Sequence, residues 1–263
     1  MQGLLICEKY INIAQVNDPY YHRDNNKWRI IIMQEATKVY SKENKELFLS
    51  VIPGHFASDR FHVNYYIDMT NLKMRMTNAK MVAETMSKRY ISKSNMSSLG
   101  SQFAGLAGNL EAMTTMNAVT KPVDTIVCMD GTEVIGSYLA EEFTKVGVHT
   151  ENKHKTYYVV SPEFDHAGQM VVRDNIKPMI NGKHVLVVLA SAMSGNTIAK
   201  ALRGIKSYGG IVEGISVIFT NNVTEVEGHP VYAVFSQEDL PNFKLSDPEN
   251  CDDCKAGKKM DAI

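Results

Sequence analysis

The chain has 263 residues, of which 44% are hydrophobic and 22% are charged, so it is long enough to bury a substantial core. Its 28 basic and 29 acidic residues give a net charge of -1. This balance excludes a global electrostatic attraction to nucleic acid or to an anionic membrane, and any phosphate that the protein binds must be held by local groups.

The N-terminal stretch and the cysteines indicate in which cellular compartment the protein is expected. "MQGLLICEKYINIAQ" has a short apolar run followed by Glu8 and Lys9, which is too short and too polar for a secretion signal or a membrane span. We therefore expect a cytoplasmic protein with no membrane partner. The cysteines are too few for a disulfide scaffold in a chain of this length and are expected to be reduced thiols, at Cys7, Cys128, Cys251 and Cys254.

The first third of the sequence predicts helices and irregular segments, which together form a helical N-terminal hood over residues 1–95. The two expected helices are "KWRIIIMQEATKVY" (27–40) and "TNLKMRMTNAKMVAETMSKRY" (70–90). In the second, apolar residues recur at three- and four-residue spacing, which places them on one face. Pro53 and Gly54, between the helices, are expected to break regular structure.

The pattern changes after a serine-rich segment at residues 92–102, which predicts a flexible boundary. Over residues 103–263, short apolar runs alternate with helical stretches. Strands are expected at 123–129, 155–160, 183–190, 214–219 and 231–235, and helices at 134–146 and 197–207. Because parallel strands need a crossover connection, this alternation predicts an α/β core with a parallel sheet covered by helices on both faces.

The stretch "HVLVVLASAMSGNTIAKAL" (184–202) predicts a buried strand, a tight turn and the start of a helix. The turn offers hydroxyl and amide donors, a glycine that lets the backbone approach a ligand, and free N–H groups at the helix start that can bind an anion. Ligands of such sheets bind at the carboxyl ends of strands. By itself the turn could equally be an ordinary capped helix start. The expected phosphate-binding residues are Met193, Ser194, Gly195, Asn196 and Thr197.

In order and spacing, roughly residues 45–260 resemble the type I phosphoribosyltransferases, and among them the orotate phosphoribosyltransferase family. Three stretches carry the resemblance: "VDTIVCMDGTEVIGSYLAEEF" (123–143), "INGKHVLVVLASAMSGNTIAKALRGIKSYGGIVEGISVIF" (180–219) and "VYAVFSQEDLPN" (231–242). The resemblance implies a phosphoribosyltransferase-type parallel sheet flanked by helices, a homodimer, and a turn that binds the 5′-phosphate of phosphoribosyl pyrophosphate.

Two charged groups that the resemblance implies are missing. The family's acidic pair, which engages the ribose hydroxyls, corresponds to Leu189 and Ala190, whose side chains cannot accept a hydrogen bond. The family's mobile catalytic loop corresponds to "VVSPEFDHAGQM" (159–170). His166 keeps its place at the leaving group, but Ser161, Pro162 and Asp165 stand about where the basic residues would be. Each lost cation costs the transition state roughly 2 to 4 kcal/mol, so the usual reaction should be crippled.

The family's pyrophosphate loop, which follows the first core strand, corresponds to Asp130, Gly131, Thr132 and Glu133. One interpretation is that Asp130 and Glu133 hold Mg2+ with hard oxygen ligands. The other is that Glu133 belongs to the first turn of the next helix, where a carboxylate meets the helix dipole favourably.

The family's hood segment over the base corresponds to "IPGHFASD" (52–59), in which Gly54 and Ser58 match the family. Pro53 and His55 replace its usual serine and lysine, which leaves base recognition open. His55 and His62 are either ligands or solvent-facing residues, and a lone histidine is more often the latter.

"CDDC" at residues 251–254 has the two-residue gap of a zinc knuckle, but a tetrahedral site needs two further ligands. His229 or a second copy of the chain could supply them. A thiol pair without metal is the simpler expectation. Lys200, Arg203 and Lys206 crowd one helix face, which we interpret as solvated and not as a nucleic-acid footprint.

The sequence therefore leaves two main classes. The first is an orotate phosphoribosyltransferase-like protein that binds a ribose 5-phosphate, phosphoribosyl pyrophosphate or a nucleotide and, if catalytic, transfers phosphoribosyl to a base. The second is a non-catalytic, nucleotide-sensing or regulatory module on the same fold, which requires only the phosphate turn. A dinucleotide-dependent oxidoreductase fits the sheet but lacks G-x-G-x-x-G after a strand.

Overall fold

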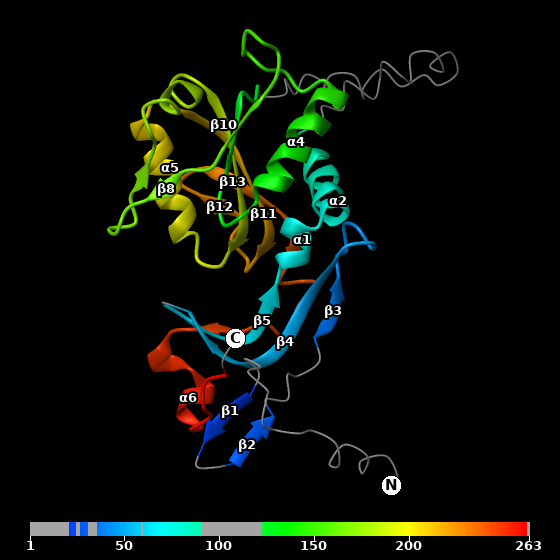
Figure 1. Cartoon of the computed structure of the whole chain (residues 1–263), viewed down its shortest axis with the longest axis vertical. Coiled ribbons are helices and arrows are strands. Elements are labelled where there is room, and N and C mark those ends of the chain that lie inside the picture. The colour runs from blue at the N-terminus through cyan, green and yellow to red at the C-terminus, as the bar shows by residue number, and fades with distance from the viewer. Residues whose placement is uncertain (1–20, 25–26, 31–35, 59, 91–121, 262–263) are drawn as a thin grey trace, which may run out of the picture. The chain divides into compact units, whose positions relative to one another are not determined.

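The computed structural model describes residues 21–24, 27–30, 36–58, 60–90 and 122–261 (Figure 1). The chain divides into two compact units, residues 1–35 and residues 36–263. In the first unit, the described residues form β1 (Tyr21–Asp24) and β2 (Lys27–Ile30), which pair in antiparallel fashion. The second unit contains all the other elements described below.

The helix expected over residues 27–40 is wrong. β2 covers its start, and β3 (Thr37–Tyr40) covers its end. β3 is rich in β-branched and aromatic residues and pairs with β4 (Phe48–Ala57), so that Val39 lies opposite Leu49. Pairing with a neighbouring strand thus decided the conformation of this segment. The boundary predicted at residues 92–102 lies outside the described residues.

The large sheet of the second unit has six strands in the order β12-β13-β11-β10-β6-β7. Every pairing in it is parallel except that of β12 with β13 at one edge. The predicted parallel sheet is therefore confirmed. Its strands are β6 (Thr125–Cys128), β7 (Tyr158–Val160), β10 (His184–Ala192), β11 (Ile211–Thr220), β12 (Glu225–Val226) and β13 (His229–Ser236).

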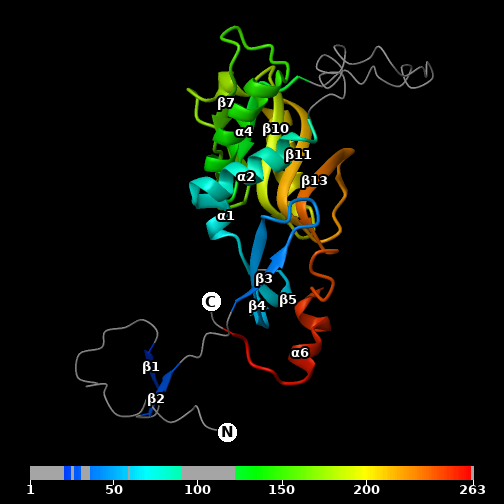
Figure 2. The same ribbon diagram turned by 90° about the vertical axis from the view of Figure 1, so that its right-hand side faces the viewer.

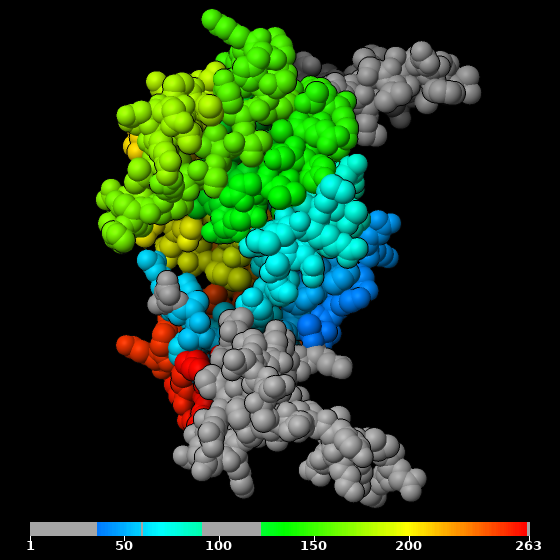
Figure 3. Space-filling model, in the orientation of Figure 1, coloured from blue at the N-terminus to red at the C-terminus, as the bar shows by residue number. Residues whose placement is uncertain are grey.

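Helices cover both faces of this sheet. α1 (Thr70–Met74), α2 (Met76–Ser87) and α4 (Glu133–Val146) pack on one face, and α5 (Asn196–Ser207) packs on the other (Figures 1 and 2). In the space-filling view, the side chains of α2, in cyan, adjoin those of α4, in green (Figure 3). The helix predicted over residues 70–90 is confirmed, with a break at Arg75, whose backbone is extended.

The central strand β10 shows why its sequence is apolar without alternation. Leu186, Val188 and Ala190 belong to the hydrophobic cluster that includes α2 and α4. Val187 and Leu189 belong to the second cluster, which includes α5. Because both faces of a covered parallel strand are buried, residues 185–190 of β10 are all apolar.

The described residues of the predicted helical hood also contain an antiparallel sheet. Its order is β14-β5-β4-β3, with β5 at His62–Asp68 and β14 at Leu245–Ser246. Pro53 and Gly54, where a break was expected, do not end the strand, because both lie within β4. The expected irregularity is found in the strand pairing, since the register of β4 with β5 shifts between Pro53 and Phe56. β3 pairs only with residues 48–51 of β4, so the proline lies beyond this ladder, where its missing N–H is tolerated.

The chain returns to this small sheet after the last core strand. β14 pairs with β5, and the hydroxyl of Ser41 donates a 2.7 Å hydrogen bond to the carbonyl of Val234 in β13. The N–H of Lys42 donates to Asp239 at 2.8 Å. Described residues of the hood segment (1–95) and of the core (103–263) are therefore joined by strand pairing and by side-chain hydrogen bonds. Among the described residues, no helix is long and apolar enough to cross a membrane.

Candidate functional site

The turn between β10 and α5 has the backbone that its sequence predicts. Gly195 precedes the first residue of α5 and adopts a left-handed conformation with φ of 77°. A Cβ at this position would lie 3.1 Å from a methyl group of Val226, so the conformation and the neighbouring strand both favour glycine. The first turn of α5 carries no acidic residue that would repel an anion. Its N–H groups can therefore donate hydrogen bonds to an anion.

A pocket of about 610 Å³ opens over this turn. All five residues predicted to bind phosphate, 193–197, line it, and so does Ala190 at the end of β10. Asp130, which follows β6, contributes from the neighbouring strand. The connection between β4 and β5 contributes Ser58, Arg60 and Phe61 from the small sheet. The pocket thus lies at the carboxyl ends of adjacent parallel strands, where ligands of open α/β sheets bind.

In the described part of the chain, two cations line the pocket, and the sequence interpretation missed both. Lys200 lies one helical turn after Asn196, and Arg60 lies in the β4–β5 connection. Arg203 and Lys206 behave as expected for a solvated face, since both pair with Glu227, at 2.9 and 3.5 Å. The i, i+4 spacing of Lys200 from Asn196 was the available signal, because it places the two residues on the same side of the helix.

Asp130 is the predicted loop residue that reaches the pocket. Its carboxylate accepts a hydrogen bond from the backbone N–H of Ala190, at the position where the resemblance implies the acidic pair. Partial burial raises the pKa of the Asp130 carboxyl, while Lys73 and that N–H lower it by smaller amounts. The Nζ of Lys73 also donates a 2.8 Å hydrogen bond to the carbonyl of Asp130. A carboxylate is therefore present beside the turn between β10 and α5, supplied by the segment after another strand.

The other residues of this loop have different surroundings. The hydroxyl of Thr132 donates to the carbonyls of Met129, at 2.8 Å, and Val188, at 3.1 Å, which ties the end of β6 to β10. Glu133 is in the first turn of α4, where it accepts a 2.8 Å hydrogen bond from the hydroxyl of Ser161. Gly131 has a φ of 77° and lies near Lys73. Of the two carboxylates, only Asp130 is among the pocket-lining residues.

Leu189 and Ala190 differ in their surroundings although they are adjacent. Leu189 is fully buried against the α5 side of the sheet. Ala190 is 8% exposed and lines the pocket. Because successive side chains of a strand point to opposite faces, only one of these two positions can present a side chain to the ligand.

His166 lies in the turn between β8 (Glu163–Phe164) and β9 (Met170–Val171) and is exposed. It is not among the residues that line the pocket. The carboxylate of Asp165 accepts hydrogen bonds from the N–H groups of Ala167 and Gln169 at 2.9 and 2.8 Å, so it shapes this turn. A role of His166 at a leaving group stays a prediction.

Comparison with solved structures gives three examples of similar proteins. A phosphoribosyltransferase from Corynebacterium diphtheriae is 16% identical, with 68% of this chain and 86% of that chain covered and a TM-score of 0.40. Orotate phosphoribosyltransferase from Mycobacterium tuberculosis is 16% identical, with coverage of 73% and 92% and a TM-score of 0.41. Adenine phosphoribosyltransferase from Thermoanaerobacter pseudethanolicus is 13% identical, with coverage of 76% and 95% and a TM-score of 0.40.

No protein-family model matches the chain, and no curated protein matches it. The three solved structures belong to the class that the sequence resembles.

Proposed function

We propose that this protein binds a phosphorylated ribose, as a ribose 5-phosphate, phosphoribosyl pyrophosphate or a nucleotide, in the pocket over the β10–α5 turn. The phosphate accepts hydrogen bonds from the N–H groups at the start of α5, and the positive charges of Lys200 and Arg60 offset its negative charge. The sugar extends toward Ala190 and Asp130. The observation that supports this most directly is that all five turn residues, 193–197, line one pocket together with two cations.

Asp130 fits a Mg2+ ion shared with the ligand. It is the one carboxylate among the described residues that line the pocket. Mg2+ is commonly bound by one or two carboxylates together with substrate phosphates and water, so one protein carboxylate is sufficient. Glu133, which is hydrogen-bonded to Ser161, would have to turn toward the pocket to join it. When bound, the ion would neutralise phosphate charge beside Asp130.

Isothermal titration calorimetry with ribose 5-phosphate, phosphoribosyl pyrophosphate, uridine monophosphate and unphosphorylated ribose tests the proposal. The three phosphorylated compounds should bind at least about tenfold more tightly than ribose, because each charge-assisted hydrogen bond contributes roughly 1.5 to 3 kcal/mol. Equal affinity for ribose and ribose 5-phosphate, or no binding of any phosphate ester, would overturn it.

Replacing Lys200 by methionine should weaken the binding of ribose 5-phosphate roughly 10- to 150-fold, which corresponds to about 1.5 to 3 kcal/mol for a hydrogen bond to a charged group. Methionine keeps an unbranched side chain that is one atom shorter, and it removes the ammonium group with its charge and its hydrogen-bond donors. Lys206→Met is the matched control, since Lys206 lies on the same helix but pairs with Glu227. Equal affinities of the two variants for ribose 5-phosphate would contradict the role of Lys200.

The pH dependence of binding tests Asp130. Because the pKa of Asp130 is raised, its carboxyl takes up a proton at a higher pH than an ordinary aspartate does as the solution is acidified, and the protonated form cannot hold Mg2+. The strengthening of phosphoribosyl pyrophosphate binding by Mg2+ should therefore vanish on acidification at a midpoint above the ordinary value of about 3.9. Asp130→Asn should show less Mg2+ dependence at every pH. An unchanged Mg2+ effect in this variant would refute the assignment.

Phosphoribosyl transfer is the second candidate function, favoured by the carboxylate of Asp130 and the cations of Arg60 and Lys200 around one pocket. The β8–β9 hairpin residues 161–170 contain no lysine or arginine, so we give binding precedence over catalysis. Release of pyrophosphate from phosphoribosyl pyrophosphate in the presence of Mg2+ and orotate, or another base, would establish transfer. Binding without release would assign the protein to the sensing or regulatory class. The homodimer remains a prediction, to be tested by light scattering.

A further inference from the structure

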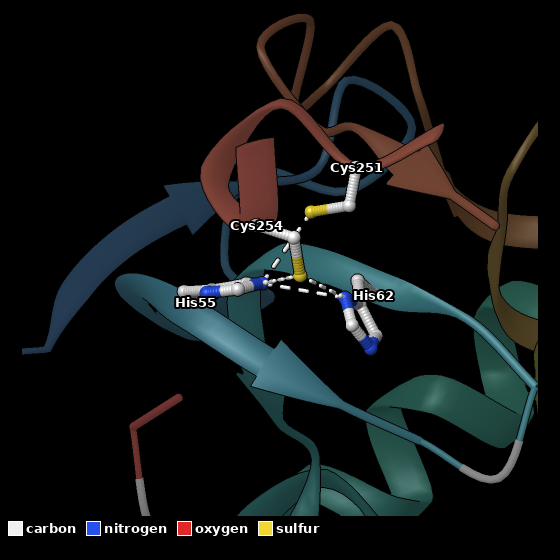
Figure 4. Close-up of side chains that lie close together, drawn as sticks. All are labelled: His55, His62, Cys251 and Cys254. Atoms are coloured by element: carbon white, nitrogen blue, oxygen red, sulfur yellow. Dashed lines mark hydrogen bonds between the residues drawn. The ribbon is translucent and has the colours of Figure 1, made fainter. Parts of the chain in front are cut away.

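Four side chains that belong to no part of the pocket converge at the far end of the small sheet (Figure 4). His55 lies in β4 and His62 begins β5. Cys251 follows the short helix η5 (Pro248–Asn250), and Cys254 lies in α6 (Asp252–Lys255). One potential ligand atom from each residue lies within 4.8 Å of all the others. We propose that these four residues bind a tetrahedral metal ion, specifically Zn2+.

The distances between the ligand atoms are those of a tetrahedral site. The Nε2 of His55 is 3.3 Å from the Nδ1 of His62. The sulfur of Cys251 is 3.4 Å from Nε2 of His55, and that of Cys254 is 3.5 Å from the same nitrogen and 3.2 Å from Nδ1 of His62. Zinc bond lengths in tetrahedral geometry give separations of about 3.3 Å between two nitrogens and about 3.5 Å between nitrogen and sulfur. The side chains therefore already have nearly the spacing that the ion requires.

The backbone around His55 fixes the imidazole for metal binding. Its Nδ1 lies 3.1 Å from the carbonyl of Lys258. A carbonyl only accepts, so Nδ1 carries the proton and Nε2 presents a lone pair toward the cysteines. The N–H of His55 also donates to the carboxylate of Asp261, and the N–H of Asp261 donates to the carbonyl of His55. The C-terminal segment is thus aligned along β4.

Burial favours a shared ion over four separate polar groups. His55 is 1% exposed, Cys251 is 5% exposed and His62 is 8% exposed, while Cys254 is partly exposed. Buried polar atoms need partners, and one ion satisfies all four ligand atoms at once. Two thiolates and two imidazoles in tetrahedral arrangement are the donor set of Zn2+.

The other grouping of metal-binding residue types in the described part of the chain is of a different kind. It consists of Asp124, Glu151 and His184. The Oδ1 of Asp124 accepts hydrogen bonds from the Thr150 hydroxyl and from the N–H groups of Glu151 and Asn152, and its Oδ2 accepts one from the N–H of His184. Asp124 is therefore committed to holding the loop before β7, and we assign no metal to it.

The proposed site differs from two expectations from the sequence, namely the source of the two missing ligands and a thiol pair without metal. The two ligands that "CDDC" lacked are His55 and His62, and His229 is not one of them. The thiol pair without metal is replaced by a four-ligand site. The two histidines lie 192 to 199 residues before the cysteines with which they are in contact, and no local motif spans such a distance.

The metal would stabilise one wall of the ligand pocket. His55 and His62 lie on the two strands that lead into and out of the connection with Ser58 and Arg60, which line the pocket. An ion held between these strands and the C-terminal cysteines would fix the start and the end of this connection. This consequence rests on the proposed function, whereas the metal site itself does not.

Elemental analysis of protein purified in a reducing buffer without chelator gives the first test. We expect about one zinc ion per chain. After removal of the metal and addition of Co2+, the same site should show the visible absorption of tetrahedral cobalt and a near-ultraviolet thiolate-to-cobalt band. Stoichiometric Co2+ binding without these bands, or no metal uptake at all, would overturn the proposal.

Variants locate the site. Cys254→Ser and His62→Gln should each lose most of the zinc, whereas His229→Gln should keep it. A chelator should lower the melting temperature of the wild-type protein and leave that of Cys254→Ser nearly unchanged. If the cysteine variant fails to fold, the Co2+ spectrum of the wild-type protein still decides. Full zinc content in both ligand variants would refute the assignment, whatever the result for ribose 5-phosphate.

Discussion

Gly195→Ala is expected to abolish most of the affinity for ribose 5-phosphate. At φ of 77° an alanine is strained by roughly 1 to 2 kcal/mol, and its Cβ would lie 3.1 Å from Val226. The turn can relieve both effects only by moving the N–H groups that receive the phosphate. We expect affinity to fall by about 2 to 3 kcal/mol, or roughly 30- to 150-fold, in a calorimetric titration.

Gly182→Ala provides the matched control. Gly182 has a similar left-handed φ of 66°, but a Cβ there would meet nothing within 4 Å and the residue is not in the pocket. Gly182→Ala should lose about 1 kcal/mol of stability, as Gly195→Ala does through the same backbone strain, and it should keep its affinity for ribose 5-phosphate. If both variants bound ribose 5-phosphate equally well, the amides at the start of α5 would not be the phosphate site.

The second large effect concerns Leu189 and Ala190, which stand at the positions where the resemblance to the phosphoribosyltransferases implies an acidic pair. Leu189→Asp should destabilise the protein by about 4 kcal/mol or more, because it buries an unpaired carboxyl in the cluster against α5. Ala190→Asp should cost less, because this side chain lines the pocket. It should also tighten ribose 5-phosphate binding about tenfold through a charge-assisted hydrogen bond to a sugar hydroxyl.

Chemical denaturation and calorimetry on the two variants separate these expectations. Ala190→Asn controls for side-chain size, since it adds the same volume without the charge. Similar losses of stability in the two aspartate variants would contradict the opposite orientations of their side chains. An Ala190→Asp variant that binds the sugar phosphate more weakly than Ala190→Asn would place the sugar elsewhere, or would show that repulsion by Asp130 prevails.

The candidate site was predictable in the parts that depend on one continuous stretch of sequence. The turn at residues 193–197 was found because a buried strand, a glycine and a helix start follow one another within a few residues. Lys200 and Arg60 were missed for different reasons. Lys200 shares a helix with two surface cations, so only its position near the pocket distinguishes it. Arg60 reaches the pocket from a separate sheet, which no local pattern indicates.

Secondary structure shows the same division. The helix over residues 70–90 and the central strand β10 follow from apolar periodicity, which depends on near neighbours. β3 was mistaken for the end of a helix because its conformation depends on pairing with β4. At Pro53 the sequence indicated an irregularity, and the structure has one as a register shift within a strand that continues beyond it. In the wrong prediction the deciding partner was another segment of the chain.

By itself the sequence determined the alternation of strands and helices, the parallel sheet and the glycine turn between β10 and α5, because each depends on residues that are close along the chain. Only the tertiary structure decided that Asp130 lies at the end of β10 and that His55 and His62 meet the C-terminal cysteines. The physical reason is that chain folding brings distant side chains within a few ångströms. Metal binding and charge neutralisation depend on that separation in space and not on spacing in the sequence.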